Sequence, residues 1–124
     1  MPTLAEDREA IRDLYARYCL YLDNGAAREW AALYADDGEF VGGGDRVVGR
    51  GDLEAYAARL QPGTVHRIVA NHVIDVDADV AACQASVVLI AGGVVVSSGR
   101  TADELHRIAG SWRIFRRTYV SDSS

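Results

Sequence analysis

The sequence has few cysteines, no long hydrophobic run and a deficit of positive charge. Its 124 residues include two cysteines, Cys19 and Cys83, without the spacing of a disulfide framework. We expect both to be reduced thiols, as is usual in the cytoplasm. No apolar run approaches the roughly 20 residues that a membrane-spanning helix needs. The first ten residues are acidic, whereas a signal peptide begins basic and then turns apolar. We therefore expect a cytoplasmic protein.

The charge balance bears on possible partners. With 13 basic and 18 acidic residues the formal net charge is −5, which disfavours binding to nucleic acid or to an anionic membrane. The length suits a single domain, 1–124, with one core or one small pocket. Residues 121–124 are predicted to be a frayed tail.

Motifs for metals and common cofactors are also missing. The two cysteines form no CxxC pair, and the three histidines have no HxxxH or HxH spacing. There is no GxSxG elbow, Walker A loop or GxGxxG junction. We expect no metal and no cofactor.

The segment 11–25, IRDLYARYCLYLDNG, predicts an amphipathic helix that ends on a carboxylate. Its apolar and aromatic residues recur every three or four positions and so share one face. Thr3 and Glu6 match a capping box at the start of this helix. Asp23 lies at the negative end of the helix dipole, which disfavours a carboxylate and predicts a cationic partner.

Two shorter helices and two short strands are predicted next. The helices cover residues 26–34 and 52–60, the second with Asp52 as its N-cap. The short strands, 39–41 and 46–48, flank a loop of three glycines that lacks the features of a phosphate cradle.

Four long strands rich in β-branched residues follow, at 65–76, 80–90, 94–108 and 112–120. Short turn-like segments separate them, which predicts an antiparallel meander. Helices followed by strands indicate an α+β domain with the helices on one face of the sheet. Strands of this length must twist and curl. We therefore expect a cone-shaped, curled antiparallel or mixed sheet closed by three N-terminal helices.

Both histidines of the strand at 65–76 have the same parity. His66, Ile68 and His72 belong to its more apolar side, which is predicted to face the helices. We interpret His66 as the cationic partner of Asp23, and His72 as a surface or merely hydrogen-bonded histidine. A solvent-exposed His66 is the alternative, and a bulge between the two histidines would reverse the parity.

The order of these features resembles the SnoaL-like branch of the nuclear transport factor 2-like superfamily. The resemblance covers nearly the whole chain, through IRDLYARYCLYLDNG, ALYADDGEF, VGRGDLEAY, TVHRIVANHVIDVD and GSWRIFRRTY. It implies a cystatin-like α+β roll. The superfamily includes scytalone dehydratase, bile acid 7α-dehydratase, hexachlorocyclohexane dehydrochlorinase, limonene epoxide hydrolase, ketosteroid isomerase, polyketide cyclases and members without activity.

The resemblance also implies catalytic residues. Asp23 and His66 match the aspartate and histidine of the dehydratases and the dehydrochlorinase, and Tyr18 matches a catalytic or oxyanion-binding tyrosine. The ketosteroid isomerase base would fall near Gly42, which has no side chain, and the second histidine of scytalone dehydratase aligns with Gln84. The implied activity is a cofactor-independent lyase or isomerase of the dehydratase or cyclase type. Asp23 would orient His66, which would remove a C–H proton.

The expected ligand is a small, hydrophobic, oxygenated metabolite in the cone. Candidate binding residues are Tyr15, Trp30, Tyr56, Ile68, Gln84 and Arg107, with Arg117 as the alternative to Arg107. An inward arginine would favour a substrate with a carboxylate. The rival interpretation is a binding or assembly module without catalysis. The two differ in whether Asp23 and His66 lie within hydrogen-bond reach inside a pocket.

A homodimer is expected through the sheet face away from the helices. Val65, Val69, Val73 and the run Val94-Val95-Val96 are predicted to lie there. An exposed apolar patch of this kind usually marks an interface, and a two-fold dimer is the commonest closed assembly.

Overall fold

The computed structural model describes residues 1–123, with three helices and six strands in that part of the chain. In chain order the elements are α1 (Leu4–Asp23), α2 (Ala27–Ala31), β1 (Tyr34–Gly42), β2 (Asp45–Val48), α3 (Arg50–Ala58), β3 (His66–Asp77), β4 (Val80–Ala91), β5 (Val94–Ile108) and β6 (Ser111–Ser121).

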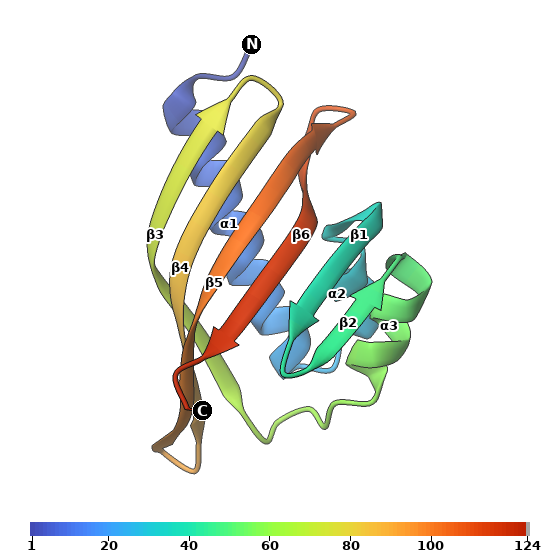
Figure 1. The fold of residues 1–124 in the computed structure, drawn as a ribbon, viewed down its shortest axis with the longest axis vertical. Helices are drawn as coiled ribbons and strands as arrows, with labels where there is room; N and C mark the ends of the chain where they lie inside the picture. The colour runs from blue at the N-terminus through green and yellow to red at the C-terminus, as the bar shows by residue number, and fades with distance from the viewer. Residues whose placement is uncertain (124) are drawn as a thin grey trace.

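The six strands of the described chain form one mixed, curled sheet in the order β2-β1-β6-β5-β4-β3. The meander β3 to β6 is antiparallel, and β1 pairs with β6 in parallel. Helix α1 lies along one face of the meander, and α2 and α3 lie beside β1 and β2 (Figure 1). The α+β cone predicted from the sequence is confirmed.

Helix α1 forms and is anchored as predicted. Thr3 and Glu6 make both hydrogen bonds of the capping box, and the helix buries one face that includes Ile11, Tyr15 and Leu22. That face packs on the meander in a core with Trp30, Leu53, Leu105 and Ile114, which are all fully buried. The core therefore lies between the helices and the concave face of the sheet.

The boundaries of both short helices differ from the prediction, and β1 begins earlier than predicted. The second helix ends at Ala31, and Tyr34 begins β1 because its strand pairs with β6 opposite Ile114. The third helix starts at Arg50 with Gly49 as N-cap, so Asp52 lies in its first turn and is not the cap. Long-range strand pairing overrides the local helical pattern in the first case.

At the C-terminal end, β6 continues to Ser121. Asp122 accepts a hydrogen bond from Ser98 Oγ at 2.7 Å, and its backbone N–H donates to the carbonyl of Ser98 at 2.9 Å. Of the predicted tail, Ser124 lies outside the described residues.

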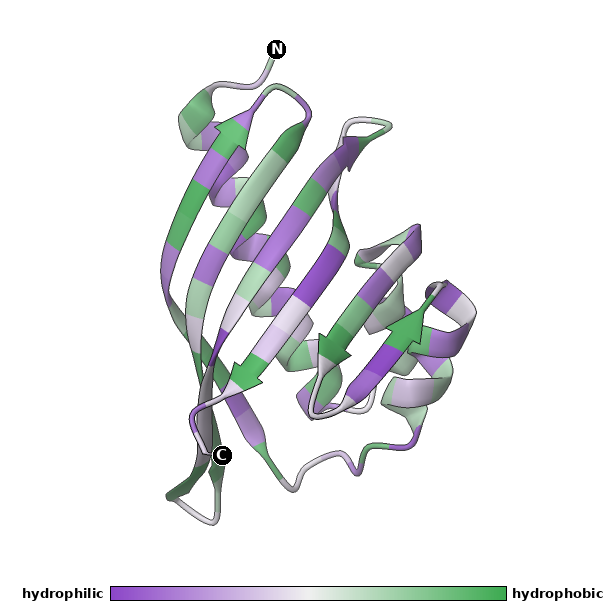
Figure 2. Ribbon diagram, in the orientation of Figure 1, coloured by the Kyte–Doolittle hydropathy of each residue, from purple (hydrophilic) through white to green (hydrophobic). Residues whose placement is uncertain are grey.

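A bulge in β3 decides which residues face the core. Pairing with β4 shifts register between Ala70 and Val73, where Asn71 has a φ of 60°. Before the bulge Arg67 and Val69 are half-buried and His66 and Ile68 are exposed; after it His72 and Ile74 turn inward. Figure 2 shows that β3 carries both hydrophilic and hydrophobic residues along its length. The predicted facing of the first half of the strand is therefore wrong, because an extra residue reverses the parity.

Candidate functional site

A pocket opens between the end of α1, the β1–β2 hairpin, α3 and the concave face of the meander. Its volume is about 270 Å³. Most of its wall is aliphatic or aromatic, and a few polar groups converge on it. The lining residues that carry the argument are Tyr18, Trp30, Asp45, Tyr56, Arg67 and Arg117. An apolar pocket with few polar groups is the usual form of a small-molecule site.

The inner end of the pocket is built around Arg117 of β6. This side chain is 4% exposed, and its Nη1 donates to Asp103 Oδ2 at 2.5 Å. The register pairs these two residues across β5 and β6. Tyr15 also donates to Asp103, at 2.6 Å, and the guanidinium lies over the Tyr18 ring at 4.3 Å from its centroid. Arg117 is therefore held in one position at the pocket wall.

Burial sets the protonation of this cluster. Burial raises the pKa of Tyr18, so its hydroxyl is neutral at neutral pH. This hydroxyl shares a hydrogen bond of 3.0 Å with the hydroxyl of Tyr34, in which either oxygen can donate. Burial also raises the pKa of Asp103, against the opposing effect of Arg117. Burial acts to lower the pKa of Arg117, but its neighbours, with Asp103 among them, hold the pKa above its ordinary value, and the guanidinium stays charged.

Asp23 is paired with arginine and not with histidine. Arg67 donates to it twice, from the backbone N–H at 3.0 Å and from Nη1 at 2.9 Å. His66 Nδ1 lies 3.9 Å from Asp23 Oδ2, beyond hydrogen-bond length, and the His66 side chain is 76% exposed. The cationic partner predicted for Asp23 exists, but it is the next residue along the strand. The predicted hydrogen bond between Asp23 and His66 is not formed. The catalytic role of these two residues stays a prediction.

The other predicted site residues divide into two groups. Tyr18, Trp30 and Tyr56 line the pocket, and so does Arg117, the alternative to Arg107. Tyr15 is 1% exposed and contacts Asp103 from behind the pocket. Ile68 is 50% exposed, and Gln84 lines a groove on the outer sheet face. Ile68 was placed inside by a parity that the bulge reverses, and Gln84 by its alignment with the second histidine of scytalone dehydratase.

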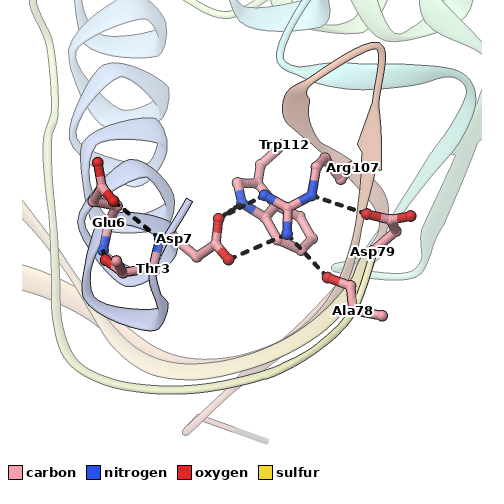
Figure 3. A network of polar contacts seen from close by, with 7 residues as sticks. All are labelled: Thr3, Glu6, Asp7, Ala78, Asp79, Arg107 and Trp112. Carbon is pink, nitrogen blue, oxygen red and sulfur yellow. Dashed lines mark hydrogen bonds and ion pairs between the residues drawn. The ribbon is translucent and has the colours of Figure 1, made fainter. Parts of the chain in front are cut away.

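Arg107 is held elsewhere in the fold. Its Nη1 and Nη2 donate to Asp7 near the start of α1, at 2.6 and 3.1 Å, and its Nε donates to Asp79 at 3.0 Å (Figure 3). Trp112 stacks against the guanidinium and donates to Asp7 at 3.2 Å. Arg107 fastens the helix to the far end of the meander, so its predicted binding role is wrong.

Sequence reasoning missed three polar residues of the site, namely Arg67, Asp103 and Asp45. Arg67 was passed over because its parity was assigned to the outer face. Asp103 and Arg117 stand opposite each other in the meander, and a pair of opposite charges at facing positions of predicted strands was the signal available. Asp45 follows the glycine loop and lines the pocket, and the residue is exposed to solvent.

The sequence that builds this pocket and fold matches a known domain family. The model of the SnoaL-like domain matches residues 3–118. The chain belongs to the SnoaL-like domain family. No curated protein is a significant match for this SnoaL-like chain.

Solved structures agree on the fold. Rv3472 of Mycobacterium tuberculosis, described as of unknown function, is 28% identical with a TM-score of 0.87, over 94% of this chain and 72% of that one. An NTF2-like protein with a cystatin-like fold from Novosphingobium aromaticivorans is 26% identical with a TM-score of 0.87, over 98% and 86%. A candidate scytalone dehydratase from the same organism is 21% identical with a TM-score of 0.80, over 93% and 83%. The last similarity shows the fold alone.

Two further findings concern the described residues only. No group of three or more histidine, cysteine or acidic residues among residues 1–123 is placed to hold a metal ion. In the same part of the SnoaL-like chain, no helix has the length and apolar character to cross a membrane.

Proposed function

We propose that this protein is a cofactor-independent lyase or isomerase for a small, mostly apolar molecule with a carbonyl group. The observation that carries the proposal is the convergence of Tyr18 and Arg117 on the inner end of an apolar pocket. Arg117 is a charged donor, and the neutral hydroxyl of Tyr18 is free to donate to a ligand when Tyr34 donates to it. Together they would stabilise an oxygen atom that gains negative charge in the transition state. The family and its neighbours include dehydratases, which makes this reaction class a natural one for the fold.

The proton acceptor we assign is Asp45. It is the one carboxylate among the described residues that line the pocket, whereas His66 points to the outer side of β3. Asp45 would take a proton from the carbon beside the carbonyl, and the electron pair would move to the carbonyl oxygen, near Tyr18 and Arg117. Return of the proton to another carbon gives isomerisation. Departure of a hydroxyl group that takes up this proton gives dehydration.

A binding or assembly module without catalysis is the second candidate. It is favoured by one contact: Asp23, the expected orienting carboxylate, is already occupied by two hydrogen bonds from Arg67. Such a module keeps the pocket and needs no proton acceptor.

The rate at which a model ketone exchanges its protons for deuterium separates the two candidate functions, and this test needs no knowledge of the natural substrate. The ketone 2-tetralone has acidic protons beside its carbonyl and can be followed by proton NMR in D₂O. The lyase or isomerase proposal predicts exchange faster than in buffer by about 10²-fold or more, the usual contribution of a positioned acid or base. Binding of the ketone with exchange at the buffer rate would favour the binding module.

A further inference from the structure

The charges around the pocket are arranged in layers. Arg67 and Arg117 line the pocket, while their carboxylate partners, Asp23 and Asp103, do not. Each ion pair therefore turns its guanidinium toward the cavity and its carboxylate away from it. An acidic protein thus presents a positively charged inner wall to a ligand.

Arg67 has hydrogen-bonding capacity to spare. A guanidinium carries five N–H donors in a planar fork, and among residues 1–123 the side chain of Arg67 makes one hydrogen bond, from Nη1 to Asp23. Its side chain is 20% exposed, and none of its other nitrogen atoms is among the buried, unpartnered ones of the described residues, so the remaining donors stay accessible from the pocket. An oxygen atom of a ligand would replace water at these donors, and hydrogen bonds from a charged group to a carboxylate are stronger than those to a neutral oxygen.

Arg67 is also fixed in advance. The backbone N–H and Nη1 of this residue bind the same carboxylate of Asp23, at 3.0 and 2.9 Å. Asp23 at the end of α1 therefore fixes the positions of both the β3 backbone and the Arg67 guanidinium. Little conformational entropy remains to be lost by Arg67 when a ligand binds. A planar fork held in this way matches the two oxygens of a carboxylate better than it matches a single neutral oxygen.

From this placement we infer that the substrate is a small keto acid whose carboxylate binds the free donors of Arg67 while its carbonyl oxygen lies near Tyr18 and Arg117. The inference rests on the proposed function and adds the ligand class. A purely structural role for Arg67, as the neutralising partner of Asp23, predicts no preference for acids over neutral ligands.

Two tryptophans make binding visible in the protein itself. Trp30 lines the pocket, whereas Trp112 contacts Asp7 and Arg107 at the far end of the meander. They are the two tryptophans of the chain, so the indole N–H signals in a ¹H–¹⁵N NMR spectrum report pocket and remote site separately. Suitable probes are phenylacetate and its neutral isostere phenylacetamide.

The wild type should bind phenylacetate about tenfold or more tightly than phenylacetamide, with shifts at Trp30 and none at Trp112. Arg67→Gln combined with Asp23→Asn removes both charges together and avoids leaving a buried carboxylate unpaired. In this double variant the preference for the acid should disappear, while the Trp112 signal stays native. Arg8→Gln removes an equal charge from an exposed position of α1 and should keep the preference.

Equal binding of acid and amide to the wild type would overturn the inference and leave the proposed pocket function standing. Retention of the preference in the double variant with a native Trp112 signal would also overturn it. If neither probe shifts Trp30, both the inference and the proposed pocket function fail.

Discussion

Asp23 accepts two hydrogen bonds from a single residue of β3, one from the backbone N–H of Arg67 and one from its Nη1. The contact joins the C-terminal end of α1 to an edge strand of the sheet. It also fixes which side of the strand meets the pocket, because His66 and Arg67 point in opposite directions. The charged residues of the described chain that line the pocket are two arginines, Arg67 and Arg117, and one carboxylate, Asp45, which is exposed.

Proton abstraction should depend on Asp45 and not on His66. We expect Asp45→Asn to reduce the exchange of 2-tetralone protons by about 10²-fold or more, and His66→Gln to leave it within twofold of the wild type. Exchange rates from proton NMR in D₂O check both. The catalytic pair predicted from the sequence requires the reverse order, so a large loss in His66→Gln would restore it.

Removal of one charge of the buried pair at the pocket should be far more damaging than removal of both. Arg117→Met leaves Asp103 buried without its cation and should cost about 3–5 kcal/mol of unfolding free energy. The double variant Arg117→Met with Asp103→Leu should regain most of that loss. Urea denaturation of the four proteins in the cycle measures this, and equal costs for the single and double variants would speak against the pairing.

Stability should fall in acid through Asp7. Arg107 holds the pKa of Asp7 below its ordinary value of 3.8, so the folded protein binds fewer protons than the unfolded chain in this range. Stability from this group is present above the ordinary pKa and is lost as pH falls below it. Asp7→Asn should flatten the dependence of melting temperature on pH below about pH 4. An unchanged slope would show that the contact in Figure 3 does not persist in solution.

The outer sheet face remains our proposal for a homodimer interface. Val73, Val120 and the run Val94–Val96 are 58–62% exposed, although Val69 packs toward the core and does not belong to this face. Sedimentation at micromolar concentration should show a dimer, and Val73→Lys should shift it toward monomer by placing a charge in the interface. A wild-type monomer at that concentration would refute the proposal.

The sequence was sufficient for the fold because each element carries its own local signal. Thr3 and Glu6 cap α1, and alternating β-branched residues define the long strands. Half of the site was also foreseeable, since Tyr18, Trp30 and Tyr56 belong to apolar faces that must turn inward. The partner of Asp23 was not foreseeable. The bulge at Asn71 depends on pairing with β4 and turns His66 outward, and the residues around it do not indicate where the register shifts.

Filling the pocket tests the central claim most directly. Leu89 of β4 lines the pocket, opposite Arg67 in the strand register, and Leu89→Trp places an indole in the cavity without removing any polar group. The account predicts that exchange of 2-tetralone protons in D₂O falls to the buffer rate while the Trp112 signal stays native. Exchange that continues at the wild-type rate in a folded Leu89→Trp protein would show that the chemistry does not occur in this pocket.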